Sequence, residues 1–384
     1  MLTRLEIDGF KSLRDFEIDL EPLTVLVGPN GAGKSNILEA LGLISRLGEH
    51  YRPEEALKLG RGRASDQFWR HGEERAQSMS LVLETLDPDG SEDSVWAIRN
   101  RYQIQLTRSG VGASERVEAE KSARLIPAAN DPWLAAHSDW HKKTDWPKDW
   151  PSFMMDELSF FPWFKVLHLN AAHLREASER IDTGELASDA SNLPSVLASL
   201  PETTLGDIRA ELVNLIPGLS GFRIVEHDES YQVELQTLDG EVVPARLASD
   251  GTLRMLALLT AVLGERARDS LICIEEPENG IYPGRLRRLI DLLREATAWT
   301  QYHQDSSERP PPQVIVTTHS PVFLTALREH PQLLRYVDVV RRDRCRVTRA
   351  RSLATGEQHE PGRRVSVREI EAVLAGIWRN ESDR

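Results

Sequence analysis

The stretch GPNGAGKS, residues 28–35, restricts what this chain can fold into more than any other. It follows an apolar run, LTVLV, and precedes a segment over 36–47 whose apolar residues recur at helical spacing. A strand, a glycine-rich turn and a helix in this order match the pattern G-x-x-x-x-G-K-S/T at every position, which a chance glycine-rich turn would rarely do. The glycines allow backbone N–H groups to surround a phosphate chain, and the lysine reaches its β- and γ-phosphates. The serine hydroxyl can bind Mg²⁺. The residues predicted to bind the nucleotide here are Gly28, Pro29, Asn30, Gly31, Ala32, Gly33, Lys34, Ser35 and Asn36, with Ser35 also a magnesium ligand.

A second candidate site is LICIEE, residues 271–276, in which four apolar residues precede two acids. A strand this apolar belongs inside a sheet, so its acids emerge at the carboxyl edge, where α/β proteins bind ligands. Glu275 can hold Mg²⁺ and Glu276 can polarise an attacking water. Because adjacent carboxylates repel each other unless a cation balances them, a metal explains the pair better than a solvated strand end.

Two further segments carry polar groups beside apolar runs. VIVTTHSP, residues 314–321, ends an apolar strand at His319. A histidine at a strand end is usually structural, but beside a γ-phosphate it would donate a hydrogen bond to that group. ARLASDGTLRMLALL, residues 245–259, begins an apolar helix with Ser-Asp-Gly. Such a helix start presents unpaired N–H groups that suit an anion, although nothing nearby in the sequence supplies one.

The order of elements predicts an α/β fold with a mainly parallel core sheet. Strands and helices alternate after residue 165, whereas alternating apolar residues over 2–7, 16–27 and 78–108 favour an antiparallel N-terminal sheet. We therefore expect an N-terminal lobe with the phosphate loop (1–108), an insertion rich in Trp and Pro (109–164), a C-terminal lobe (165–340), and a basic hairpin with a C-terminal helix (341–384).

Composition indicates in which cellular compartment the protein works. The chain has 384 residues, of which 40% are hydrophobic, and its two cysteines, Cys273 and Cys345, are not spaced for a disulfide or a metal. No apolar run approaches the roughly 18 residues of a membrane span, and the first residues do not resemble a signal peptide, so we expect a cytoplasmic protein with no membrane contact.

The insertion over 109–164 is either a docking or base-stacking surface or the cover of a small subdomain. It contains Trp133, Trp140, Trp146, Trp150 and Trp163.

A basic segment stands out in a chain whose net charge is −13. Residues 335–351 carry seven arginines against two aspartates and alternate like a hairpin that turns near Asp343. The segment is either a solvated edge hairpin or a contact for a phosphate backbone or a protein partner.

These pieces, in this order, resemble the ABC-type ATPases of the SMC/RecF/OLD group. The resemblance rests on GPNGAGKSN, SDGTLR, LICIEEPENGIYP and VTTHS and covers residues 1–108 and 165–340. It implies a P-loop NTPase fold of ABC-head type that binds ATP and Mg²⁺ and hydrolyses ATP at Glu276 with His319. The opening LEIDGFKSL resembles the first strand of the group, which implies that Lys11 and Ser12 lie near the nucleotide base. The magnesium-contacting glutamine of the group has no clear match, and Gln67 is the candidate.

The resemblance also implies a homodimer that encloses two nucleotides. Ser249 and Gly251 of one head would bind the γ-phosphate held by the partner's Lys34, and the loop over 277–283 would touch the other protomer. No coiled coil is visible, and the roughly 45 residues after 340 are too few for a TOPRIM nuclease domain. We therefore expect an ATP-dependent switch that controls a separate effector chain, such as a nuclease or toxin, in DNA maintenance or defence, with DNA as a possible ligand. The alternatives are a nucleotide-dependent scaffold with little turnover and a transporter subunit.

Overall fold

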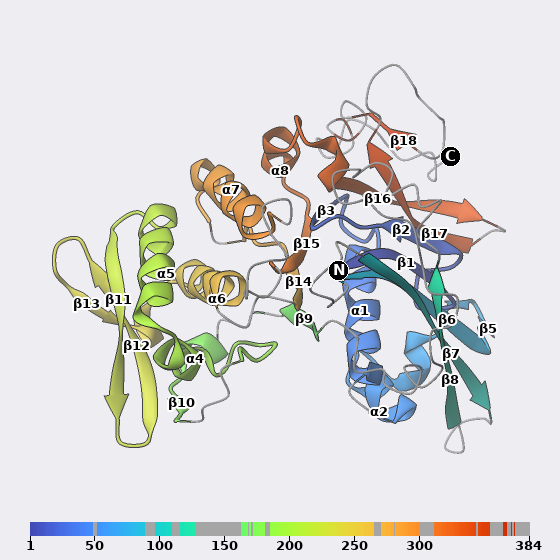
Figure 1. Ribbon diagram of the computed structural model, residues 1–384, viewed down its shortest axis with the longest axis horizontal. Coiled ribbons are helices and arrows are strands. Elements are labelled where there is room, and N and C mark those ends of the chain that lie inside the picture. The colour runs from blue at the N-terminus through green and yellow to red at the C-terminus, as the bar shows by residue number, and fades with distance from the viewer. Residues whose placement is uncertain are drawn as a thin grey trace.

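The structure is a computed structural model with two lobes on either side of a central sheet (Figure 1). It describes residues 1–48, 52–88, 97–109, 116–126, 163–167, 169, 172–180, 185–264, 270–279, 281–298, 311–342, 345–353, 364–366, 370 and 372. Within these residues no helix combines the length and the apolar character that a membrane span requires.

The central sheet has the strand order β18-β17-β16-β3-β15-β14-β9. Five of its strands are parallel, and β17 runs antiparallel to β16. Its strands are β3 (Leu23–Val27), β9 (Trp163–Leu167), β14 (Ser270–Glu275), β15 (Gln313–Thr318), β16 (Leu334–Arg342), β17 (Cys345–Leu353) and β18 (Arg364–Val365). Every residue of β3 and β15 is buried, as the apolar residues at the centre of each strand predict. The mainly parallel core expected from the sequence is confirmed.

An antiparallel sheet forms the N-terminal lobe with the order β2-β1-β6-β7-β8. Its strands are β1 (Leu2–Asp8), β2 (Phe16–Asp19), β6 (Ser78–Pro88), β7 (Ala97–Ser109) and β8 (Arg116–Ile126). β8 lies inside the segment 109–164 that the sequence predicts as an insertion. Because β8 pairs with β7 along its whole length, the regular sheet extends beyond residue 108. Four of the five tryptophans of that segment lie outside the described residues.

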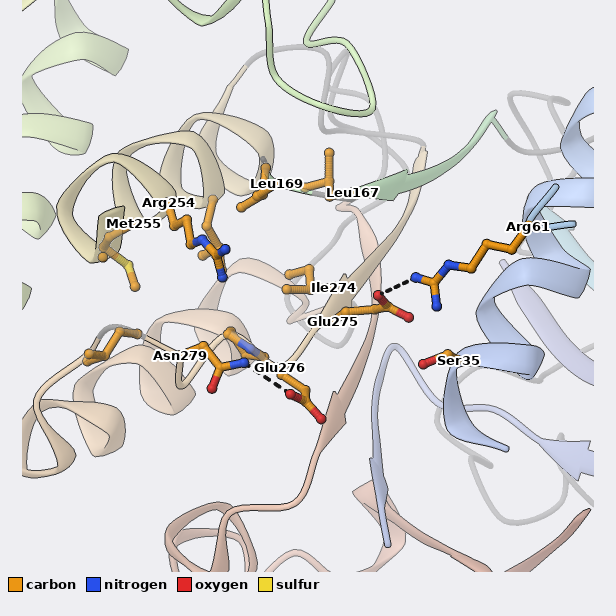
Figure 2. A pocket seen from close by; sticks show the side chains of 14 residues that line it. Ser35, Arg61, Leu167, Leu169, Arg254, Met255, Ile274, Glu275, Glu276 and Asn279 are labelled. Carbon is orange, nitrogen blue, oxygen red and sulfur yellow. Dashed lines mark hydrogen bonds and ion pairs between the residues drawn. The ribbon is translucent and has the colours of Figure 1, made fainter. Parts of the chain in front are cut away.

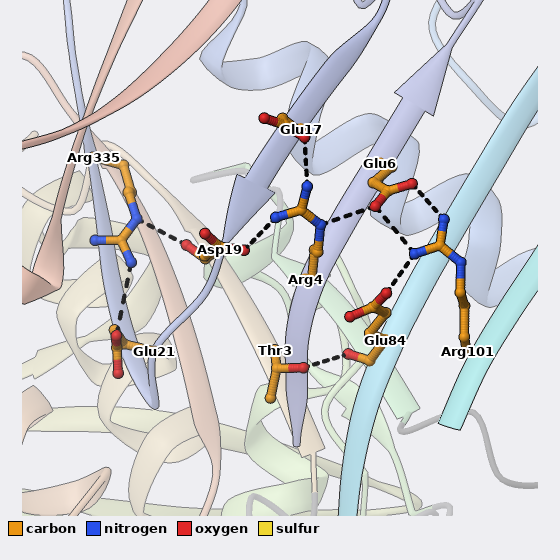
Figure 3. Close-up of polar contacts among 9 residues, drawn as sticks. All are labelled: Thr3, Arg4, Glu6, Glu17, Asp19, Glu21, Glu84, Arg101 and Arg335. Carbon is orange, nitrogen blue, oxygen red and sulfur yellow. Dashed lines mark hydrogen bonds and ion pairs between the residues drawn. The ribbon is translucent and has the colours of Figure 1, made fainter. Parts of the chain in front are cut away.

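A network of ion pairs joins the strands of this antiparallel sheet (Figure 3). The Arg101 guanidinium pairs with Glu6, at 2.5 Å, and with Glu84. Arg4 pairs with the same Glu6 at 2.8 Å and with Asp19 at 2.8 Å. The hydrogen bond from Arg101, supported by Arg4, lowers the pKa of Glu6 from 4.5 to about 2 despite the opposing effect of burial.

Helix α1 (Lys34–Gly48) packs between this sheet and the central one. Its apolar residues Ile37, Leu38, Leu41 and Ile44 are fully buried, together with the inner side chains of β1 and β6. Each such side chain contributes about 1.5–3 kcal/mol by leaving water. The helix start is thereby held at the end of β3.

The second lobe is built from helices and a small hairpin sheet on the other side of the central sheet (Figure 1). Its helices bury one face each in a single apolar core shared with the central sheet. The elements are η7 (His173–Arg175), β10 (Ser178–Glu179), α4 (Leu193–Ser199), α5 (Glu202–Leu215), β11 (Leu219–His227), β12 (Ser230–Thr237), β13 (Val242–Pro244), η8 (Ala245–Leu247), α6 (Asp250–Leu263), η10 (Pro283–Arg285), α7 (Leu286–Ala296) and α8 (Pro321–Ala326). The remaining short elements are α2 (Pro53–Lys58), η1 (Ala64–Gln67), β4 (Arg70–His71), β5 (Glu74–Arg75) and η12 (Pro331–Leu333).

Candidate functional site

The loop between β3 and α1 holds its lysine in a defined position. Lys34 Nζ donates hydrogen bonds to the carbonyls of Gly28, at 2.7 Å, and Pro29, at 3.0 Å. Burial lowers the pKa of the Lys34 amine, while the negative charges of Glu276 and Glu278 oppose that shift. The ammonium group is therefore buried, aligned with the loop and close to two carboxylates. Asn30 and Gly31 are exposed at the tip of the loop.

The glycines of this loop are required by close backbone contacts. A Cβ at Gly28 would lie 2.1 Å from the Val337 carbonyl oxygen. Gly33 has φ +99°, and a Cβ there would lie 2.0 Å from Thr348 Oγ1. The Thr348 hydroxyl also donates to the carbonyl of Ala32 at 3.0 Å. Strands β16 and β17 thus form the floor under the phosphate loop.

Lys11 and Ser12 both contact helix α1. Ser12 Oγ is 2.6 Å from Thr348 Oγ1 and accepts a hydrogen bond from Asn36 Nδ2 at 2.7 Å. Lys11 forms an ion pair with Glu39 on α1 and has a left-handed backbone with φ +44°. The structure therefore brings Ser12 next to the phosphate loop, whereas Lys11 lies against α1 and the segment that carries Arg61.

The strand order β3-β15-β14 brings the ends of three strands together, so that Lys34, His319 and Glu276 lie side by side. Glu276 Oε1 is 3.2 Å from His319 Nδ1. On its other side, Glu276 Oε2 accepts from Asn279 Nδ2 at 3.0 Å (Figure 2). Glu276 has φ +44°, which is unusual for a residue with a side chain. Its N–H still donates to the Thr317 carbonyl at 2.9 Å, so the strained turn is anchored to β15.

Glu275 pairs with a residue that the sequence did not single out. Arg61 Nη2 lies 3.1 Å from Glu275 Oε2 (Figure 2). Arg61 Nε also lies 3.4 Å from Glu39 Oε1. Arg61 follows α2, far from any recognised motif, so only the tertiary structure reveals the contact. A lone arginine between glycines carries no sequence signal that would have identified it.

Gln67 is buried, and its Nε2 donates to the carbonyl of Arg61 at 2.7 Å. Among the described residues that line the adjoining pocket, Arg61 rather than Gln67 comes from this segment. The structure therefore shows Gln67 supporting the loop that carries Arg61.

The pocket has a volume of about 400 Å³ and lies between α6 and the end of β14 (Figure 2). Ser35 and Glu275 line it from one side, and Gly251 and Arg254 line it from the other. Gly251 therefore faces a pocket that contains Ser35 of its own chain, a relationship that the sequence did not predict.

The predicted helix start is present at α6. Ser249 is the N-cap, and its Oγ accepts from the Thr252 N–H at 3.2 Å. Arg175 anchors the same turn: its Nη2 donates to the Ala248 carbonyl at 2.8 Å and lies 2.5 Å from Asp250 Oδ1. The start of α6 is thus fixed by its own cap and by an arginine from η7.

The basic segment forms the expected hairpin of β16 and β17, but much of its charge is neutralised within the fold. Arg349 and Arg351 each lie 2.8 Å from the buried Asp338. Arg335 is buried and donates to the Asp19 carbonyl at 2.8 Å. Among the described residues β17 pairs with β18 only at Ser352 and Leu353, so most of this strand lies at the sheet edge and both interpretations of the segment stay predictions. The exposed basic surface near the turn retains Arg341 and Arg346.

The oxygen atoms that could bind a metal here suit a magnesium ion that is also bound by the phosphates of a nucleotide. Within the described residues no three His, Cys, Asp or Glu side chains are grouped to hold a metal ion. Magnesium at a nucleotide site needs only one or two protein ligands, since phosphates and waters supply the others. Ser35 and Glu275, which line one pocket beside the phosphate loop, meet that requirement.

Comparisons with known proteins agree with this geometry. The sequence model of the family described as "AAA domain, putative AbiEii toxin, Type IV TA system" matches residues 23–325. The ATP/GTP phosphatase of Helicobacter pylori is 23% identical over 350 residues, which cover 85% of this chain and 87% of that protein. The DNA replication and repair protein RecF of Streptomyces avermitilis is 36% identical over 85 residues, which cover 21% of this chain and 23% of RecF.

The fold has a solved counterpart. The SMC head bound to the C-terminal winged-helix domain of ScpA superposes with a TM-score of 0.55 and 18% identity, covering 92% of this chain and 98% of that one. With a family match over most of its length, a complete phosphate loop and an SMC-head fold, the chain belongs to the AAA-domain family of that description and is an ABC-type ATPase of the SMC/RecF/OLD group.

Proposed function

We propose that this ATPase is a switch: it pairs with a second copy around two ATP molecules, and hydrolysis separates the two heads. The observation that supports the chemical part is the convergence of Lys34, Glu276 and His319 at the ends of adjacent strands. Phosphoryl transfer to water requires a cation that binds the phosphates, a carboxylate that orients the water and a hydrogen-bond donor to the γ-phosphate. Lys34, Glu276 and His319 are groups of these three kinds.

Each residue has a defined part in this proposal. Backbone N–H groups of 28–33 and the Lys34 ammonium bind the β- and γ-phosphates. Ser35 and Glu275 hold Mg²⁺, which when bound balances the charge of the phosphate oxygens. Glu276 orients the attacking water and accepts its proton, and His319 donates a hydrogen bond to the γ-phosphate.

Pairing of two heads is supported by the residues that surround the site. The start of α6 presents N–H groups of the first turn beyond the Ser249 cap, as a γ-phosphate from a second copy would require. Two large apolar side chains are exposed before α6 and after β14: Leu247, 70% exposed, ends η8, and Tyr282, 71% exposed, follows Asn279 in the chain. In the proposed pair these two side chains become buried against the second copy, which would stabilise the contact.

The partner is proposed to be a separate chain of a DNA-related or defence system. This part rests on the names of relatives, a DNA replication and repair protein and an OLD nuclease, which are matched over 21% and 12% of this chain. Arg341 and Arg346 near the hairpin turn are candidate contacts for DNA or for that partner.

A scaffold with little turnover is the second candidate. The ion pair between Arg61 and Glu275 supports it, because the carboxylate proposed for Mg²⁺ already has a cation beside it. Turnover near background in the purified protein, with intact ATP binding, would favour this reading.

The deciding experiment measures the solution mass of Glu276→Gln by light scattering, with ADP and with ATP–Mg²⁺. We expect Glu276→Gln to be a monomer with ADP and a dimer with ATP–Mg²⁺. The control variant Lys34→Ala should remain a monomer with either nucleotide. A monomer with bound ATP would reject pairing driven by ATP. A dimer in both nucleotides would place the contact on another surface.

A further inference from the structure

Glu278 lies in the loop after β14, within the segment 277–283 expected to touch a second protomer, but no chemical role has been assigned to it. Its side chain is 8% exposed, compared with 32% for Glu276 two residues earlier. Taking a carboxylate out of water is costly unless a specific contact compensates it. The contacts of Glu278 therefore indicate why the group is there.

One oxygen of Glu278 contacts the end of β15 at two hydrogen-bond donors. Oε1 accepts from Thr318 Oγ1 at 2.6 Å and from the His319 backbone N–H at 3.2 Å. The same oxygen lies 3.6 Å from His319 Nδ1. A single carboxylate thus contacts the hydroxyl before the histidine, its backbone and its ring.

These contacts determine how the imidazole faces the rest of the site. Nδ1 of His319 lies 3.2 Å from Glu276 Oε1 and 3.6 Å from Glu278 Oε1, so this edge of the ring faces the two acids. The opposite ring nitrogen, Nε2, then points away from them. We propose that Glu278 is the positioning residue of His319, which holds the ring so that Nε2 faces the γ-phosphate. The inference rests on the proposed function of His319.

The remaining oxygen of Glu278 argues against a purely stabilising role. Oε2 is buried and has no hydrogen-bond partner among the described residues. Such an oxygen lowers stability, and an apolar side chain at this site would avoid the loss. The charge also acts on the site, because it is one of two carboxylates that favour the protonated form of Lys34.

The experiment compares Glu278→Ala with Glu278→Gln in steady-state ATP hydrolysis. Glutamine keeps a carbonyl oxygen for the Thr318 hydroxyl and the His319 N–H, whereas alanine removes it. We expect the alanine variant to lower kcat about tenfold with KM for ATP within about twofold, and the glutamine variant to restore most of kcat. Glu229→Gln, an exposed acid in the turn between β11 and β12, is the matched charge control.

Two more variants separate this inference from the proposed function. His319→Ala tests the histidine itself: unchanged kcat would reject its proposed role, and the positioning role with it. If His319→Ala is slow but Glu278→Ala is fully active, the positioning role of Glu278 is rejected while the role of His319 stands. The same holds if Glu278→Gln is as slow as Glu278→Ala. If Glu278→Ala does not fold, Thr318→Val removes the hydroxyl partner. We then expect kcat to fall about threefold, and unchanged kcat in that variant counts against Glu278.

Discussion

The guanidinium of Arg61 lies 3.1 Å from the carboxylate of Glu275, although 214 positions separate the two residues in the chain. Glu275 is also the residue proposed to hold Mg²⁺ beside Ser35. Arg61 and Mg²⁺ are both cations attracted to this one carboxylate, and their mutual repulsion weakens the binding of each while the other is present. Arg61 thus competes with the metal for this carboxylate.

Replacing Arg61 therefore changes the response to magnesium. We expect Arg61→Ala to lower the Mg²⁺ concentration for half-maximal ATP hydrolysis by about two- to fivefold, a modest effect because the arginine is 60% exposed. Titration of Mg²⁺ at fixed ATP measures it, and titration of ATP at saturating Mg²⁺ detects any separate loss of nucleotide binding. A higher Mg²⁺ requirement in the variant contradicts the competition.

A methyl group at Gly33 is expected to destabilise the phosphate loop. Its Cβ would lie 2.0 Å from Thr348 Oγ1 at a φ of +99°, so Gly33→Ala should lower the free energy of unfolding by about 2–4 kcal/mol. Gly240→Ala, at φ +87° with open space around it, is the control and should lose only about 1 kcal/mol. Urea unfolding without nucleotide compares them. Partial recovery by adding Thr348→Ala would identify the clash as the cause.

Arg175 is expected to matter for pairing more than for ATP binding. Removing its contacts to Ala248 and Asp250 loosens the start of α6, and we expect Arg175→Ala to weaken ATP-dependent dimerisation of Glu276→Gln about tenfold. Binding of a fluorescent ATP analogue to the monomer should stay within about twofold of the parent. Arg180→Ala, which breaks a surface pair with Glu226, is the matched control. Equal dimerisation of the two variants would remove the α6 start from the interface.

The ion-pair network of the antiparallel sheet predicts a loss of stability in acid. The pKa of Glu6 is lowered from 4.5 to about 2 in the folded chain, so its ionised form stabilises the fold above the unfolded pKa. That contribution declines as pH falls from about 4.5 to about 2. Because Glu6 is partly exposed, we expect Glu6→Gln to cost only about 1 kcal/mol at pH 7. Urea unfolding between pH 7 and pH 3 should show a shallower pH dependence in Glu6→Gln than in Glu17→Gln, an exposed acid of the same network.

Features that depend on neighbours in sequence were predicted from the residues. The strand, loop and helix around 23–47 and the apolar strand ending at Glu275 were placed correctly because each is a short-range pattern. The start of α6 was also predicted, since Ser249 followed by Asp-Gly is an N-cap signal. By contrast, α5 (Glu202–Leu215) was not predicted, although Leu205, Ile208 and Leu212 recur at helical spacing.

Features that depend on distant residues were not predictable in the same way. Nothing in the sequence around Arg61 indicates that it pairs with Glu275, because the contact exists only after the N-terminal lobe packs against the central sheet. The arginines of β17 were interpreted as a surface charge, yet Asp338 on the adjacent strand binds two of them. Pairing across strands decides whether a charge is free, and sequence spacing alone does not report it.

The floor of the phosphate loop has a consequence for how the protein is made. Thr348 on β17 holds both Ala32 and Ser12, which the ribosome produces more than three hundred residues earlier. Thr348 can stabilise the phosphate loop only after most of the chain has left the ribosome. A nascent or truncated chain that lacks β17 would therefore carry every residue of the phosphate-binding sequence but lack the contacts that Thr348 makes beneath the loop.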